Sequence, residues 1–215
     1  CDTPFTWNWV GTNFAHRDMT TGENLKYDPA KEIKVMTASE VLYKVNELLQ
    51  KFPGIRNIVL SGGEPLMHQR SQQFSHLLGI LKTLGLSIEI ETNGTLKPKD
   101  HIVELIDQFN VSPKLANSNN SEASRVSPKA YEFYTGFSKA MFKFVVTSDE
   151  DMQEIIDLRT RFNIPARKVM LMPEGRTAEE TARRAQELVE VCKKEGYRYC
   201  NRLHVQIWHG AVRGV

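Results

Sequence analysis

The chain has 215 residues, 40% of them hydrophobic and 25% charged, a composition typical of a globular domain with a substantial core and not of a disordered chain. A formal net charge of +2, with no block of like charges, argues against a nucleic-acid binder, and we expect a small-molecule partner. No apolar run approaches the roughly 18 to 20 residues that span a bilayer, which argues against a membrane protein.

The cysteines are few and scattered. Cys1, Cys192 and Cys200 form an odd, widely spaced set, which argues against a disulfide framework and favours a reducing, cytoplasmic environment. The chain begins with Cys1 instead of Met, so we expect a segment upstream of it.

Helical periodicity recurs along the chain. Val41, Val45 and Leu49 share one face of a predicted helix over Ala38–Lys51, with Thr37 as its N-cap. Further helices are predicted from about 71 to 84, from about 99 to 109, from about 128, from 149 to 162 and from 177 to 195.

Short apolar runs alternate with these helices. Strands are predicted at Asn57–Leu60, 87–91, 142–146, 168–171 and, last, 203–208, and residues 117–127 are predicted to form an exposed loop. Alternating strands and helices favour an α/β fold with a mostly parallel sheet and helices outside, either open or curled toward a barrel. Its ligand site is expected at the carboxyl ends of the strands.

Two glycines follow the first predicted strand directly. Gly62 and Gly63 allow a ligand to approach the backbone closely, and Glu64 adds an acceptor, although a bare Gly-Gly pair is also common in ordinary tight turns. The Gly-x-Gly-x-x-Gly and Gly-x4-Gly-Lys-Ser/Thr signatures are both missing from the sequence, which sets aside dinucleotide and P-loop sites.

The segment Ser61-Gly62-Gly63-Glu64-Pro65 resembles the Gly-Gly-Glu-Pro motif of radical S-adenosylmethionine enzymes, and Cys1 resembles the last cysteine of their cluster loop. In such a loop three thiolates hold a [4Fe-4S] cluster, and the remaining iron is left for the amino and carboxylate groups of the cofactor. The resemblance implies a partial (β/α) barrel. It also implies that S-adenosylmethionine and the cluster are cofactors.

Within that superfamily, the opening Cys1-Asp2-Thr3-Pro4-Phe5-Thr6-Trp7 is similar to a segment of the 7-carboxy-7-deazaguanine synthases. The same holds for Ser112-Pro113-Lys114 and for the end of the chain, Leu203 to Trp208 with Arg213-Gly214-Val215. These three spaced matches cover essentially the whole chain.

Roles for individual residues follow from this resemblance. Cys1 is implied as a cluster ligand and Thr3 as a Mg²⁺ ligand, which suits a hydroxyl oxygen, although Thr3 could also simply cap a first turn. Cofactor contacts are implied for Asp2, Gly62, Gly63, Glu64, Glu91, Asn93, Ser112, Pro113, Lys114, Met172, Pro173, Glu174 and Gly175. Substrate contacts are implied for Ser61, His204 and Val215, the last through the C-terminal carboxylate.

Two positions carry their own alternatives. Met172 stands where relatives carry a Gln against the adenosine, so backbone contacts are expected there in place of a side-chain contact. His204 is expected in a terminal strand, where a histidine is more often packed than functional. No side chain is assigned a catalytic role, because the cofactor carries the radical chemistry.

For the full-length protein the resemblance implies conversion of 6-carboxy-5,6,7,8-tetrahydropterin to 7-carboxy-7-deazaguanine with loss of ammonia, in 7-deazapurine (queuosine) biosynthesis. It also implies an external electron donor and a possible homodimer. Residues 1–215 are expected to be one domain that lacks its N-terminal strand and most of the cluster loop, and so to be inactive by themselves. Another radical enzyme, such as a glycyl-radical activase, and a cluster-free binding protein of the same fold remain alternatives.

Overall fold

The computed structural model describes residues 8–12, 26–175 and 177–208. Their strands form one parallel sheet in the order β1-β2-β3-β4-β5-β6, which is also the order along the chain. The strands are β1 (Asn57–Leu60), β2 (Ser87–Thr92), β3 (Gln108–Val111), β4 (Ala140–Val146), β5 (Val169–Pro173) and β6 (Arg198–Tyr199). Because β1 and β6 do not pair with each other in this sheet, the barrel is partial, as the resemblance implies.

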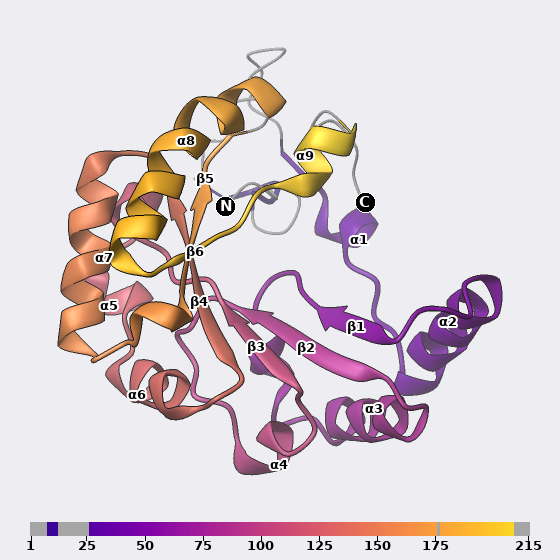
Figure 1. The fold of residues 1–215 in the computed structure, drawn as a ribbon. Helices are drawn as coiled ribbons and strands as arrows, with labels where there is room; N and C mark the ends of the chain where they lie inside the picture. Colours follow the sequence, from indigo (N-terminus) through magenta and orange to yellow (C-terminus); the bar gives the residue numbers. More distant parts are fainter. Residues whose placement is uncertain (1–7, 13–25, 176, 209–215) are drawn as a thin grey trace.

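Helices line the convex side of the curved sheet in Figure 1. The helices of the described residues are α1 (Pro29–Glu32), α2 (Ala38–Lys51), α3 (Gln72–Thr83), α4 (Asp100–Val103), α5 (Glu122–Arg125), α6 (Pro128–Gly136), α7 (Asp149–Arg161), α8 (Ala178–Glu195) and α9 (Leu203–Trp208), with 3-10 turns η2 (Pro65–His68), η3 (Ala116–Ser118) and η4 (Ala166–Lys168). The short α1 and α9 lie on the open side of the sheet (Figure 1). None of the helices in the described ranges has the length and apolar character to cross a membrane.

Local sequence explains where the long helices begin. The Thr37 side chain accepts from the backbone N–H of Glu40 while Glu40 accepts from that of Thr37, a capping box that starts α2 as predicted. Thr177 and Glu180 form the same box at α8, which ends at Glu195 and is capped by Gly196 with φ of +70°. Such caps satisfy backbone groups that a helix end leaves unpaired.

Three predictions of local structure are wrong. The helix predicted over residues 99–109 ends at Val103, and Phe109 lies in strand β3. The predicted helix includes the apolar residues of this strand. The predicted last strand, Leu203–Trp208, is helix α9, because β6 before it has only two residues, Arg198–Tyr199, and offers little edge for a further strand to pair along. The predicted loop over residues 117–127 contains α5.

The two faces of the sheet differ in character. On the face toward the helices the side chains of β2 to β5 are buried, and Ile88, Ile90, Phe109, Phe142 and Phe144 have no exposed surface. Alternate residues of the same strands, Glu89, Glu91, Asn110, Met141, Lys143 and Met170, are half-buried on the concave inner face. The side-chain period of two along a strand produces this division.

A buried lysine joins the helical layer to the sheet. Lys168, 6% exposed, precedes β5 and its ammonium group donates to the carbonyl oxygens of Tyr134, Thr135 and Phe137 at 3.1, 2.8 and 2.5 Å. These carbonyls end α6, which leaves them without helical partners, so the lysine satisfies a helix C-terminus. Burial lowers the pKa of Lys168.

Candidate active site

The loops at the carboxyl edge of the sheet bring most of the sequence-predicted site residues to one edge of the molecule. Ser61 to Glu64 follow β1, Asn93 follows β2, Ser112 to Lys114 follow β3, and Glu174 and Gly175 follow β5. Parallel strands place all these loops at the same edge, which is where α/β folds bind their ligands.

The turn after β1 leaves open space beside its backbone. Gly62 and Gly63 have φ of +88° and +52°, which favour glycine, and both residues are exposed. A Cβ added to either glycine would meet no other atom of the described residues within 4 Å. A shallow pocket lies beside the turn, lined by Ser61, Gly62, Pro65, His68 and Phe74 among others. The turn therefore leaves room for a ligand to approach the backbone closely.

Glu64 braces this turn against the next loop. One carboxylate oxygen accepts from the Thr92 hydroxyl at 2.9 Å and from the Asn93 backbone N–H at 2.8 Å, and the other accepts from the backbone N–H of Leu66 at 3.2 Å. Asn93 in turn accepts from the backbone and hydroxyl of Thr95 at 2.9 and 2.6 Å. Both predicted side chains thus hold the loops in place, which leaves backbone atoms nearby to contact a cofactor.

An ionised pair lies on the inner face just below this edge. Glu91 accepts from the Ser61 hydroxyl at 2.9 Å and from the Lys143 ammonium group at 3.1 Å. Burial acts to raise the pKa of Glu91, but the charge of Lys143, the hydrogen bonds from Ser61 and Lys143, and the charge of Lys114 outweigh it, so the pKa lies below its ordinary value. Glu91 is therefore a carboxylate at neutral pH.

The loop after β3 is fastened at both ends. The Ser112 backbone N–H donates to the Thr92 carbonyl oxygen at 2.7 Å, and the Lys114 carbonyl accepts from Arg125 at 3.4 Å. Arg125, only 8% exposed, also pairs with Glu154 of α7. Pro113 is buried, whereas Ser112 and Lys114 are half-buried and available at the site.

The loop after β5 approaches helix α8 closely. Met172 is half-buried on the inner face, Pro173 is buried, and the backbone N–H of Glu174 donates to the Val146 carbonyl at 3.0 Å. A Cβ on Gly175 would lie 2.9 Å from the backbone nitrogen of Thr181, so this position requires glycine.

Several predicted site residues lie outside the described ranges or away from the carboxyl edge. Cys1, Asp2, Thr3 and Val215 lie outside the described residues. His204 is exposed on helix α9, not in a strand. Cys192 and Cys200 are free thiols, and Cys192 is buried with its thiol 3.3 Å from the carbonyl oxygen of Arg198. Within the ranges that the structure describes, no group of three or more His, Cys, Asp or Glu side chains is placed to hold a metal ion.

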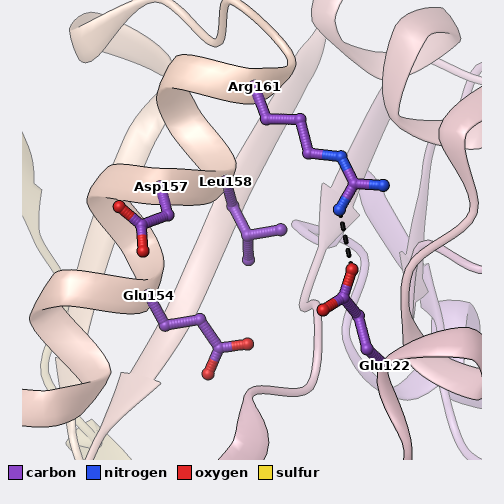
Figure 2. A pocket seen from close by; sticks show the side chains of 5 residues that line it. All are labelled: Glu122, Glu154, Asp157, Leu158 and Arg161. Atoms are coloured by element: carbon purple, nitrogen blue, oxygen red, sulfur yellow. Dashed lines mark hydrogen bonds and ion pairs between the residues drawn. The ribbon is translucent and has the colours of Figure 1, made fainter.

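A second pocket lies in the helical layer between α5 and α7. Figure 2 shows Glu122 paired with Arg161 at 2.7 Å, with Glu154, Asp157 and Leu158 on the neighbouring turns of α7. None of the sequence-predicted site residues lines it, and the carboxyl-edge loops do not contribute to it. We therefore place the candidate active site at the carboxyl edge.

Sequence reasoning did not single out Lys143, although a signal was present. A central strand of a parallel sheet is usually apolar throughout, because helices cover both faces. Lys143 in the middle of β4, like Glu89 and Glu91 in β2, interrupts that pattern. Charged residues in central strands thus marked a face that none of the long helices in the described ranges covers.

Comparison with solved structures identifies the fold. QueE from Escherichia coli superposes with a TM-score of 0.60 over 94% of this chain and 78% of its own, at 21% identity. SuiB from Streptococcus suis bound to S-adenosylmethionine gives 0.54 over 79% of this chain and 44% of its own, at 16% identity. With the Gly62-Gly63 turn at its carboxyl edge, the chain has the radical S-adenosylmethionine fold.

Comparison with curated sequences identifies the family. A protein of Pyrobaculum aerophilum named 7-carboxy-7-deazaguanine synthase is 34% identical over 160 residues, which cover 74% of this chain and 68% of the relative. The chain belongs to the 7-carboxy-7-deazaguanine synthase family. A scan against general protein-family models gives no match.

Proposed function

We propose that the full-length protein converts 6-carboxy-5,6,7,8-tetrahydropterin to 7-carboxy-7-deazaguanine with loss of ammonia, as a carbon–nitrogen lyase of 7-deazapurine (queuosine) biosynthesis. The observation that carries this proposal is the exposed Gly62-Gly63 turn at the carboxyl edge of the sheet. It lies in a chain whose relatives are named 7-carboxy-7-deazaguanine synthase.

The residues at the edge suit the cofactor that the fold implies. When bound, S-adenosylmethionine and a reduced iron–sulfur cluster would supply the radical that removes a hydrogen atom from the pterin. The Gly62-Gly63 backbone would hold the cofactor's amino group, and the loop from Ser112 to Lys114 and the loop from Met172 to Gly175 would flank its nucleoside part. Glu64 holds the Gly62-Gly63 turn against the loop after β2 through Thr92 and Asn93.

We also propose roles for three residues outside the described ranges, and we propose which partners the protein has. Cys1 would be a ligand of a [4Fe-4S] cluster, Thr3 would bind a Mg²⁺ ion that steers the substrate carboxylate, and the Val215 carboxylate would meet the pterin. We further propose an external electron donor, a cytoplasmic location and no nucleic-acid or membrane partner, with a homodimer as one possible assembly.

The decisive experiment is an anaerobic assay of the full-length, cluster-reconstituted protein with the pterin, S-adenosylmethionine, Mg²⁺ and a reductant. Product detected by mass spectrometry in the wild type and in Cys200→Ala, but not in Cys1→Ala, is expected. Cys200→Ala is the matched control, because it removes a thiol that the proposal leaves without a role.

Other results would point elsewhere. Formation of 5′-deoxyadenosine without deazaguanine would contradict the substrate assignment and favour another radical enzyme, such as a glycyl-radical activase. If the cofactor is not cleaved at all, a cluster-free binding protein of the same fold becomes the better description.

A further inference from the structure

Lys143 reaches across the inner face of the sheet to the site. It lies on β4, two strands from β2, and its ammonium group is 3.1 Å from a carboxylate oxygen of Glu91. The two side chains are 21% and 39% exposed, so water screens the pair only partly. The other carboxylate oxygen of Glu91 accepts from the Ser61 hydroxyl at 2.9 Å. Side chains of β4 and β2 and of the turn after β1 thus form one chain of contacts.

The direction of the Ser61 hydrogen bond has a chemical consequence. A hydroxyl has one donor hydrogen and two acceptor lone pairs, and here an ionised carboxylate takes the hydrogen. Ser61 accepts no hydrogen bond from the residues that the structure describes, so its lone pairs remain for a ligand. The hydroxyl therefore offers an acceptor, which suits an N–H group of the ligand and not a carbonyl oxygen.

A second ion pair, between Lys82 of α3 and Asp107 just before β3, provides a contrast. At the amino end of β2, Lys82 donates to Asp107 at 2.7 and 3.0 Å, and the same Asp107 accepts from the Ile88 backbone N–H at 2.8 Å. These side chains are 34% and 31% exposed, which resembles the Lys143–Glu91 pair. The Lys82 pair, however, contacts no loop at the carboxyl edge, so it serves the fold alone.

We propose that Lys143 is a positioning residue for the substrate: it holds the Glu91 carboxylate against the Ser61 hydroxyl, so that Ser61 accepts a hydrogen bond from an N–H group of the pterin. This inference rests on the proposed function, because it takes the pterin as the ligand at Ser61. Lys143 itself acts through Glu91. Lys114, whose charge also acts on Glu91, supports the same carboxylate from the loop after β3.

The test compares Lys143→Met with Lys82→Met in the full-length protein. Methionine keeps much of the lysine's length and removes its charge. We expect Lys143→Met to raise KM for the pterin roughly tenfold or more, the size typical of a lost charge-assisted hydrogen bond, with kcat within about twofold of the wild type. Lys82→Met should leave KM unchanged, and Lys143→Arg should recover most of the wild-type KM.

A second measurement does not depend on turnover. Calorimetric titration of the pterin into the protein without reductant should give a Kd that rises about tenfold in Lys143→Met and in Ser61→Ala. In the double variant the two increases should not multiply, because both substitutions remove the same contact. Multiplying increases would overturn the proposal, as would equal Kd values for Lys143→Met and Lys82→Met.

The proposed function and the role of Lys143 can be refuted separately. A wild-type protein that binds the pterin but releases no deazaguanine would refute the proposed function while the titrations still decide the role of Lys143. A wild type that turns over normally, with Lys143→Met indistinguishable from Lys82→Met, would refute only the role of Lys143. If Lys143→Met does not fold, Glu91→Gln decides in its place, because it removes the same charge pair and should raise Kd equally.

Discussion

The two faces of the sheet are built from alternate residues of the same strands, yet they have different tasks. Phe142 and Phe144 of β4 are fully buried on the face toward the helices, and their rings stack 6.4 Å apart. Lys143 lies between them in sequence and points to the opposite face, where it pairs with Glu91. A single strand thus supplies the core on one side and the site on the other, so substitutions one residue apart should affect different properties.

The largest effect should come from the helix-facing side. Phe142→Ala removes a side chain that also contacts Tyr131 at 5.7 Å between ring centroids, and it leaves a cavity. We expect the free energy of unfolding to fall by about 3 to 5 kcal/mol, measured by urea denaturation. The neighbouring, half-buried Met141 on the inner face is the control, and Met141→Ala should cost clearly less. Equal losses would show that the two faces do not differ as described.

The hydrogen bonds by which Glu64 joins the loop after β1 to the loop after β2 should give the next largest effect when they are removed. Glu64→Ala removes the acceptor of the Thr92 hydroxyl and of the Asn93 backbone N–H. Since Thr92 is 2% exposed, its hydroxyl would lose its partner in a buried place, and we expect a loss of about 1 to 3 kcal/mol. The kcat/KM should fall as well, because both loops border the site. Glu89→Ala, which removes only the acceptor of Asn110 at 2.8 Å, is the control and should cost less.

Low pH should lower the free energy of unfolding through Asp151 in helix α7. Its burial acts to raise its pKa, but hydrogen bonds from the hydroxyl and backbone of Thr147, from Asn117 and from Ser148 outweigh this and leave the pKa below its ordinary value. A carboxyl group with a depressed folded pKa stabilises the fold above its unfolded pKa, and this contribution disappears as pH falls through the folded value.

The sign of the pH effect can be checked with one pair of variants. We expect Asp151→Asn to be about 1 to 2 kcal/mol less stable than the wild type at pH 7, with the difference shrinking as pH falls below about 4. Urea denaturation at a series of pH values measures this. Asp149→Asn, whose side chain is fully exposed, is the matched control and should differ little at any pH. A constant difference for Asp151→Asn across the series would contradict the assignment.

The smallest effect should come from the inner face away from the edge. Asn110 donates to Glu89 at 2.8 Å and accepts from Gln108 at 2.6 Å, all on half-buried side chains. Water can replace these partners, so Asn110→Ala should change the free energy of unfolding by less than about 1 kcal/mol. A loss as large as that of Phe142→Ala would mean that this face carries part of the core after all.

The sequence by itself determined the features that depend on neighbouring residues. Capping boxes at Thr37 and Thr177 placed the starts of α2 and α8, and the Gly62-Gly63 pair marked a turn that needs positive φ angles. The strand–helix alternation predicted the parallel sheet, and the family motifs located the loops at its carboxyl edge. Each of these signals lies within a few residues of the structure that it specifies.

The tertiary structure decided what depends on distant partners. Leu203–Trp208 has the alternation of a strand, but a strand needs a neighbour to bond to, and the segment forms helix α9 beyond the edge of the sheet. Glu64 contacts a loop 28 residues away, and Lys143 contacts Glu91 across 52 residues. Pairings at such separations leave no periodic trace in the sequence, because only the packing of the sheet brings these side chains together.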